Sequence, residues 1–322
     1  MEIFRFVPIL KQTIWGGDKI LRYKHIERQM SHVGESWELS GVRGRESVVA
    51  EGPHKGMTIN EVVTEMGANL LGEENFSRFG NEFPLLIKFI DAQSDLSIQV
   101  HPDDATARMF GEERGKTEMW YIMDSDTDAS IRIGLNRHIT PKQYAEMVDN
   151  HTITDVINHY TVSEGDCFFI PAGTIHAICA GCFLAEIQQT SDVTYRIYDY
   201  NRKDKDGNLR QLHTREAAKA IDYTTKPDYH TLYTPAQEAM VKMVECPYFT
   251  TSVLDISKHI TINFSDLDSF VVFIALKGEA RIGDGRGSSA ILRQGDTILL
   301  PATVQMVGIT GKIKLLETHI KL

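Results

Sequence analysis

The chain has 322 residues, enough for one large domain or two ordinary ones. Its 34 Lys and Arg residues against 44 Asp and Glu give a net charge of −10, which argues against nucleic acid and anionic membrane surfaces as partners. No apolar run approaches the roughly 20 residues that span a bilayer, and the N-terminus lacks the pattern of a secretory signal. We therefore expect a cytoplasmic protein.

The first eighty residues combine strand patterns with one helical segment. Strands and loops are expected up to about residue 50, with the tryptophans in the core and with Glu35 and Glu38 on a solvated face. In residues 58–79 the apolar side chains recur at helical spacing. Thr58 and Glu61 have the three-residue separation of a capping box, so the helix is expected to begin there.

The next segment predicts a buried strand that carries one charge. Residues 84–91 are apolar except for Lys88 and the terminal acid. A lysine in such a strand must either extend to water or meet an anion, because an unpaired buried ammonium is costly.

Residues 97–176 contain four side chains of metal-ligating type. Gln99 and His101 alternate on a strand pattern and so share one face, and Glu118 opens the next strand-like run. His176 ends a Gly-x5-Pro-x-Gly-x2-His pattern, whose turn residues place it at a fixed distance from the preceding strand. Two imidazoles, a carboxylate and an amide oxygen suit zinc. We predict one zinc ion held by these four residues; the alternative for each histidine is an ordinary surface or core position.

The four cysteines give no sign of a second metal site. Cys179 and Cys182 form a C-x-x-C motif, but a structural zinc site would need a second pair. A redox-active pair usually opens a helix, whereas this one lies in a strand-turn-strand pattern. We expect a hairpin turn with reduced thiols.

The last third of the chain repeats the metal segment without its ligands. Residues 295–306 match residues 165–176 in the Gly-Asp pair, the apolar run and the Pro-Ala pair, but Met306 replaces His176. A chance similarity of turn chemistry is the alternative. We expect a second barrel of the same kind that holds no metal.

Together these segments resemble class I mannose-6-phosphate isomerases, also called phosphomannose isomerases, and in particular the short bacterial form within the cupin superfamily. The resemblance rests on five motifs, which are IWGG at 14–17, LSIQVHP at 96–102, GKTEMWY at 115–121, IPAGTIHA at 170–177 and YRIYDY at 195–200. It implies a mainly β fold of two cupin-like (jelly-roll) barrels with a few helices inserted in and around the first. We expect residues 1–233 to form the catalytic, metal-binding domain and residues 234–322 the metal-free domain.

The resemblance also implies a reaction, the reversible isomerisation of mannose 6-phosphate and fructose 6-phosphate. Zinc-assisted proton transfer would pass through a cis-enediol, and the family's zinc ligands fall on the four residues already chosen. Its catalytic arginine falls on Arg196, which would stabilise the developing charge. Glu186 and Lys116 are both candidates for the base, although Glu186 has the alternative role of orienting Arg196 or a ligand. The substrate-binding residues are expected to be Ser97, Lys88 and Arg202.

Two other functional classes remain open at this stage. A cupin oxygenase would use iron, whose sites favour two or three histidines, whereas the amide oxygen in this set suits a redox-silent ion better. A sugar-binding or regulatory cupin would keep the zinc but would not need Arg196 or Glu186. The expected partner is a phosphorylated hexose, with no nucleic acid and no membrane, and the expected assembly is a monomer or a weak homo-oligomer.

Overall fold

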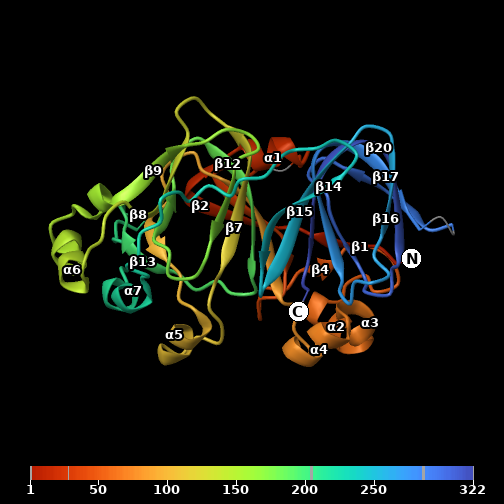
Figure 1. Ribbon diagram of the computed structural model, residues 1–322, viewed down its shortest axis with the longest axis horizontal. Helices are drawn as coiled ribbons and strands as arrows, with labels where there is room; N and C mark the ends of the chain where they lie inside the picture. The colour runs from red at the N-terminus through yellow and green to blue at the C-terminus, as the bar shows by residue number, and fades with distance from the viewer. Residues whose placement is uncertain (1, 28, 204–205, 285–286, 322) are drawn as a thin grey trace.

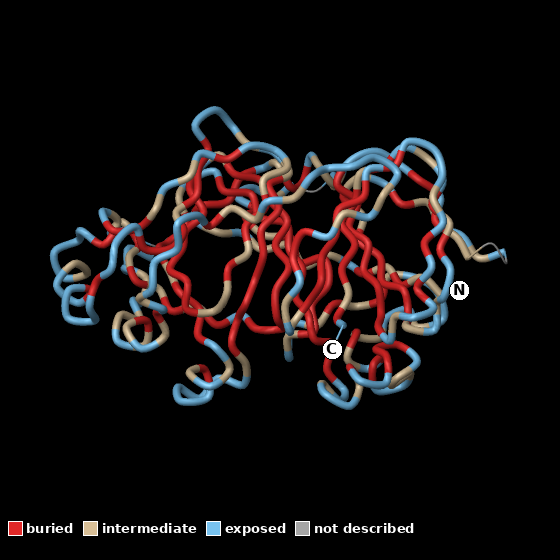
Figure 2. The backbone as a smooth tube through the Cα atoms, in the orientation of Figure 1, coloured by how far each residue is buried: buried red, intermediate tan, exposed pale blue. Residues whose placement is uncertain are grey.

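The computed structural model describes residues 2–27, 29–203, 206–284 and 287–321 and is mainly β, as the sequence predicted. Figure 1 shows two groups of strands next to each other, one built largely from the N-terminal two thirds of the chain and one from the C-terminal third. The buried backbone follows these strands, and the exposed backbone lies in the outer helices and loops (Figure 2). No helix within the described ranges is long and apolar enough to cross a membrane.

The first group is a sandwich of two antiparallel sheets. One sheet has the order β10-β7-β12-β5-β3-β2 and the other β13-β6-β11-β8-β9. Side chains from both sheets, such as Trp120 and Ile133, form one apolar core between them. The strands are β2 (Ile9–Gly17), β3 (Val33–Ser40), β5 (Leu85–Asp91), β6 (Ile98–Val100), β7 (Glu118–Ser125), β8 (Ser130–Leu135), β9 (Ile157–Thr161), β10 (Cys167–Ile170), β11 (His176–Ile178), β12 (Cys182–Gln189) and β13 (Tyr195–Tyr198).

The helices cover the edges and outer faces of this sandwich. Apolar side chains of α6 and α7 pack with Ile98 and Val100 on the outer face of the five-stranded sheet. The helices near the sandwich are α1 (Lys19–Tyr23), α5 (Asp104–Met109), α6 (Pro141–Asp149), η1 (Ile153–Val156) and α7 (Thr214–Ala220).

The helical segment expected at residues 58–79 is three short helices, α2 (Ile59–Met66), α3 (Ala68–Leu71) and α4 (Glu73–Phe79). Gly67 and Gly72 interrupt it, because their φ angles of 53° and 91° lie outside the right-handed helical region. The capping box is confirmed, since Glu61 N–H donates to the Thr58 hydroxyl and the Glu61 carboxylate accepts from Thr58 N–H.

The C-terminal sheet has the order β14-β15-β20-β17-β19-β1-β4, with β16 paired to β20 and β18 to β17. The strand β1 near the N-terminus pairs with β19, so the two ends of the chain share one sheet. The boundary at residues 233 and 234 stays a prediction. The strands are β1 (Phe4–Val7), β4 (Val48–Val49), β14 (Met240–Cys246), β15 (Phe249–Ile256), β16 (His259–Asn263), β17 (Val271–Gly283), β18 (Ser289–Arg293), β19 (Thr297–Leu300) and β20 (Met306–His319).

The internal repeat is confirmed in its backbone hydrogen bonds. Gly165 N–H donates to the Ile122 carbonyl, and Gly295 N–H donates to the Ala275 carbonyl, both at 2.9 Å. In each copy the aspartate that follows accepts from the N–H three residues earlier, at 2.8 and 2.9 Å. Both glycines have a positive φ, of 97° and 84°. The same turn is therefore built twice.

This correspondence shows which residues of the second copy stand at two of the predicted ligand positions. Counting back from the equivalent residues Ile122 and Ala275 places Val271 where the first copy has Glu118. Met306 begins β20 as His176 begins β11, and its side chain is 42% exposed. An apolar residue occupies each of these two ligand positions in the C-terminal sheet.

The structure also tests the expectations for the cysteine pair, for Trp37 and for Glu38. Cys179 and Cys182 flank the β11–β12 hairpin, and both are free thiols, as expected. Trp37 is fully buried, as expected of a core residue. Glu38, however, is only 4% exposed and pairs with Lys24 at 2.6 Å, so the expectation of a solvated face was wrong there.

Candidate metal centre and active site

The register of the five-stranded sheet aligns three of the expected site residues. Gln99 on β6 lies opposite His176 on β11 and, on its other side, opposite Arg196 on β13. Residues directly opposite each other on neighbouring strands project from the same face of a sheet. Gln99, His176 and Arg196 therefore form one row, although up to 97 positions separate them in the sequence.

The six-stranded sheet supplies a second row. Glu186 on β12 lies between Trp120 on β7 and Lys88 on β5. Glu118 is two residues before Trp120 on the same strand, so its side chain projects from the same face. The ring of Trp120 meets the His176 ring edge-on at 5.3 Å, which brings the two rows together inside the sandwich.

The turn before His176 delivers it beside His101. Gly173 has a φ of 88°, and its N–H donates to the His101 carbonyl at 2.8 Å. A side chain at this position would be strained by the positive φ and would crowd the Ala220 carbonyl at 3.0 Å. The glycine of the sequence pattern is therefore required by the backbone path.

The metal-ligating atoms of His101, Glu118 and His176 lie within 4.8 Å of one another, and all three residues are buried. Nε2 of His101 is 3.5 Å from Oε2 of Glu118, and Nε2 of His176 is 3.4 Å from Oε1. Each imidazole donates its Nδ1–H to a backbone carbonyl at 2.8 Å, those of Val193 and Thr174. These hydrogen bonds fix the tautomer that directs the Nε2 lone pair into the cluster.

The electrostatics of this cluster suit a divalent cation. Burial lowers the pKa of His101 well below its usual value and that of His176 to about 4, so both rings stay neutral ligands. Burial and the nearby Glu186 carboxylate raise the pKa of Glu118 to about 7. Oε1 of Glu118 is buried and accepts no hydrogen bond from any described residue. A buried carboxylate without enough donors is a group that a bound cation satisfies.

Gln99 is the fourth expected ligand and lies against His176. Its Nε2 is 3.3 Å from Nε2 of His176. A half-turn of the amide would place its oxygen there instead, and the two orientations differ only in hydrogen bonding. The donor set of two imidazoles, one carboxylate and one amide oxygen is therefore assembled by strands from both sheets, and it fits a metal ion.

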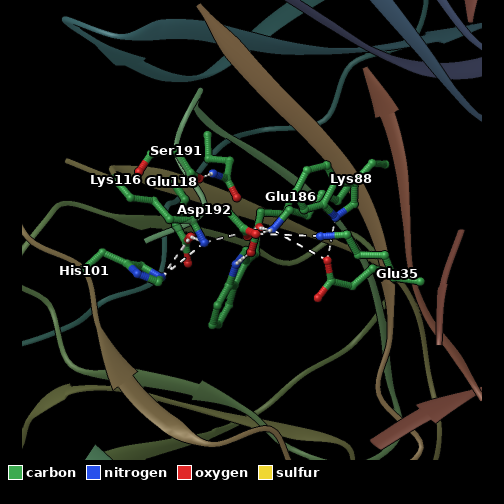
Figure 3. A network of polar contacts seen from close by, with 12 residues as sticks. Glu35, Lys88, His101, Lys116, Glu118, Glu186, Ser191 and Asp192 are labelled. Carbon is green, nitrogen blue, oxygen red and sulfur yellow. Dashed lines mark hydrogen bonds and ion pairs between the residues drawn. The ribbon is translucent and has the colours of Figure 1, made fainter. Parts of the chain in front are cut away.

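A network of lysines and carboxylates adjoins these ligands (Figure 3). Nζ of Lys116 lies 2.7 Å from Oε2 of Glu118, 3.2 Å from Nε2 of His101 and 3.6 Å from Oε1 of Glu186. Nζ of Lys88 lies 3.2 Å from the same Glu186 oxygen. Of the two alternatives expected for Lys88, contact with an anion is therefore confirmed.

The two ammonium groups decide the ionisation of Glu186. Burial alone would raise its pKa, but Lys116 and Lys88 together lower it to about 2. The other carboxylate oxygen accepts a hydrogen bond from Trp120 Nε1 at 2.9 Å. Burial lowers the pKa of Lys88, but Glu186, Glu35 and other carboxylates outweigh it and hold that pKa above its usual value. Glu186 is thus an ionised carboxylate held from three sides.

The remaining expected residues lie along β13 and the loop that follows it. Nε of Arg196 donates to the Ser97 hydroxyl at 3.3 Å, and its guanidinium also donates to the Gln211 carbonyl at 2.9 Å. Arg202 pairs with Asp199, as does Arg210, and donates to the Asp95 carbonyl. Ser97 and Arg196 therefore meet, whereas Arg202 takes part in a separate ion-pair cluster.

The structure adds site residues that the sequence reasoning missed. Trp120 holds Glu186 and packs on His176, and its two-residue spacing from Glu118 was the signal that could have found it. A cavity of about 510 Å³ adjoins the site through the Val193 carbonyl that holds His101. Its lining includes Arg43, Arg45, Arg114, Asp192, Tyr195 and His213, which come from separate loops and strands and share no local pattern.

Known proteins of one family match this chain over nearly its whole length. A family model for the catalytic domain of type I phosphomannose isomerase matches residues 3–152, and one for the cupin domain of mannose-6-phosphate isomerase matches residues 239–320. Mannose-6-phosphate isomerase ManA of Bacillus subtilis is 34% identical over 319 residues, or 98% of each chain. A mannose-6-phosphate isomerase of Streptococcus mutans is 33% identical over 315 residues, or 96% of each chain.

Solved structures of mannose-6-phosphate isomerases share the fold of this chain. A crystal structure of the Bacillus subtilis mannose 6-phosphate isomerase superimposes with a TM-score of 0.89 at 30% identity and covers 99% of this chain and 100% of that one. A zinc-bound mannose 6-phosphate isomerase has a TM-score of 0.82 at 15% identity over both full chains, which shows a shared fold.

The fold and the matched cupin domain place this protein among the cupins, as the sequence motifs implied. Within them, the chain belongs to the type I phosphomannose isomerases, also called mannose-6-phosphate isomerases. It is an enzyme of the isomerase class.

The metal centre predicts that His176→Ala lowers the affinity for a divalent ion by about 100-fold or more, because one imidazole of a closed donor set is lost. The bound metal is measured by elemental mass spectrometry after equilibrium dialysis. His159→Ala is the matched control, because His159 contacts the Ser130 hydroxyl on a neighbouring strand and is not among the ligands. Equal metal content in both variants would contradict the assignment.

Proposed function

We propose that this enzyme interconverts mannose 6-phosphate and fructose 6-phosphate by moving a proton between C1 and C2 through a cis-enediol. The observation that carries the proposal is a buried metal-ligand set next to a Lys116–Glu186 pair, with Arg196 on the strand beside Gln99. The substrates are inferred from the names of the Bacillus subtilis and Streptococcus mutans relatives.

We propose zinc as the metal, one ion per chain, held by Gln99, His101, Glu118 and His176. The zinc-bound relative of the same fold supports this choice, as does the mixture of nitrogen and oxygen donors. When bound, zinc would supply a Lewis acid that favours negative charge on neighbouring sugar oxygens.

Arg196 is proposed to stabilise the charge that develops on the substrate. Its strand partner is Gln99, so its side chain leaves the same face as two of the proposed ligands. The hydrogen bonds to Ser97 and to the Gln211 carbonyl orient a guanidinium that stays charged at any working pH. Preorganised positive charge of this kind lowers the barrier for forming an enediol or enediolate.

Lys116 and Glu186 are proposed to handle the proton. A base must take the proton from C2 of the aldose and return it to C1, while the hydroxyl proton moves between the two oxygens. Lys116 lies nearer the ligands, and Glu186 Oε1 is buried 3.6 Å from its ammonium and 3.2 Å from that of Lys88. Because the two groups interact closely, the pair rather than either residue sets the protonation of the site.

The phosphate is proposed to bind toward the cavity lined by Arg43, Arg45 and Arg114, which adjoins Arg196 through His213. Arginine forks suit phosphate oxygens. The Ser97 hydroxyl stays a candidate donor on the other side of Arg196. Lys88 and Arg202 remain proposed contacts, although both already pair with carboxylates.

The central experiment is a metal-dependent isomerase assay. Purified enzyme stripped with a chelator should lose interconversion of mannose 6-phosphate and fructose 6-phosphate, and stoichiometric zinc should restore it, because the proposed centre is incomplete without its ion. Turnover is followed by a coupled assay for fructose 6-phosphate, with His176→Ala as the negative control. Undiminished turnover in the verified metal-free protein would refute the proposal.

Glu186→Gln separates the two candidates for the base. Gln keeps the shape and the contact with Trp120 but cannot take a proton, so exchange of the C2 hydrogen with solvent should fall by about 100-fold or more. Deuterium incorporation is measured by NMR, with zinc content checked in parallel. If exchange persists at the wild-type rate while zinc is retained, Glu186 is a positioning residue and Lys116 becomes the candidate base.

Lys88→Ala tests the role of the second lysine. A phosphate contact predicts that KM for mannose 6-phosphate rises at least tenfold while KM for unphosphorylated mannose changes little. Steady-state kinetics on both sugars distinguish the possibilities. A similar loss with both sugars, mainly in kcat, would show that Lys88 instead holds Glu186 in place.

A further inference from the structure

A second cavity, of about 400 Å³, lies where the two groups of strands meet. The N-terminal sandwich contributes α1, β7 and β12 to its lining, and the C-terminal sheet contributes β17 and β20. In Figure 1, α1 lies across the junction between the two groups. Any ligand in this junction cavity would touch both halves of the molecule.

The lining of the junction cavity is cationic in an acidic protein. Four basic residues, Lys19, Arg22, Lys277 and Lys314, face two acidic ones there, against a net charge of −10 for the chain. Lys19 and Lys314 already have carboxylates within 4 Å. Within the described ranges, Arg22 and Lys277 have none, and both are exposed to solvent. The cavity thus presents two available charges, one from each half.

The buried side chain of Tyr121 also lines the cavity. Tyr121 is only 1% exposed, and its hydroxyl interacts with the hydroxyl of Tyr233 beside it. The nearby Tyr233 hydroxyl donates its proton to the Gly165 carbonyl. Nζ of Lys314 lies 5.6 Å from the centre of the Tyr121 ring.

The junction cavity is separate from the metal centre. Tyr121 is three residues after Glu118 on β7, and side chains an odd number of positions apart leave opposite faces of a strand. Tyr121 packs in the core between the two halves, whereas its neighbours Trp120 and Ile122 pack inside the sandwich that holds the ligands. One strand therefore carries a proposed ligand on one face and this hydroxyl on the other.

We propose that the junction cavity binds a small, multiply charged anion, of the phosphate ester or polycarboxylate type, at a site distinct from the catalytic one. Arg22 and Lys277 supply the charge from the two halves, and the Tyr121 hydroxyl donates a hydrogen bond. Charge-assisted hydrogen bonds of this kind recognise both anion types. Because β7 is shared, an anion bound there restrains the strand that carries Glu118.

The experiment is isothermal titration calorimetry of the full-length, zinc-loaded enzyme with pyrophosphate and, separately, with citrate. Arg22→Ala/Lys277→Ala should weaken binding by about tenfold or more, because two charged donors are lost. Lys142→Ala/Lys258→Ala is the matched control, since it removes the same charge from exposed positions outside the lining. The probe that binds more tightly identifies the anion type.

Tyr121→Phe supplies a readout that a purely structural role would not move. Phenylalanine keeps the ring in the apolar core, and the affinity for the probe should fall several-fold because one hydrogen-bond donor is lost. Competitive inhibition of the isomerase by the same probes reports binding at the catalytic site. Its inhibition constant should be the same in the wild type and in Arg22→Ala/Lys277→Ala.

Three outcomes would overturn the proposal. The first is that neither probe binds at millimolar concentration. The second is that both double variants bind the probes equally. The third is that Arg22→Ala/Lys277→Ala changes the inhibition constant as much as it changes the calorimetric affinity. The last result would assign the bound anion to the catalytic site.

Discussion

The site depends on the burial of two carboxylates in one protein interior. Glu118 and Glu186 are almost fully enclosed, and the ammonium groups of Lys116 and Lys88 lie against them. A buried charge is costly unless opposite charge lies beside it. The burial of the two carboxylates therefore requires the two lysines at these positions. The two lysines favour the ionised form of Glu186, whereas Glu118 is left with an unsatisfied oxygen that a divalent ion would complete.

The duplicated scaffold shows which part of this arrangement is structural and which is chemical. Both copies make the same turn with the same backbone hydrogen bonds, from Gly165 and from Gly295. Only the first has a carboxylate and an imidazole at the corresponding positions, where the second has Val271 and Met306. The second copy instead packs against the first through a shared apolar cluster that includes Tyr121 and Leu316. The first copy thus carries the predicted metal ligands, and the second copy packs against it and stabilises it.

Much of the candidate site could be predicted from local sequence, because short-range geometry fixes the backbone path at several of the predicted ligands. The alternation of Gln99 and His101 and the glycine turn before His176 each define a backbone path within a few residues. The helical segment was predicted with less success, since the pattern of apolar residues does not show that Gly67 and Gly72 take left-handed angles. Glycine permits such angles but does not demand them.

The sequence by itself determined the strands, the turn that presents His176, the ligand types and the repeat, because periodicity and turn residues act over short distances. Only the tertiary structure decided that Glu186 lies between Trp120 and Lys88, that β1 joins the C-terminal sheet, and that Arg22 and Lys277 face one cavity. Those contacts join segments far apart in the chain. Their register follows from the packing of whole sheets, which no local pattern encodes.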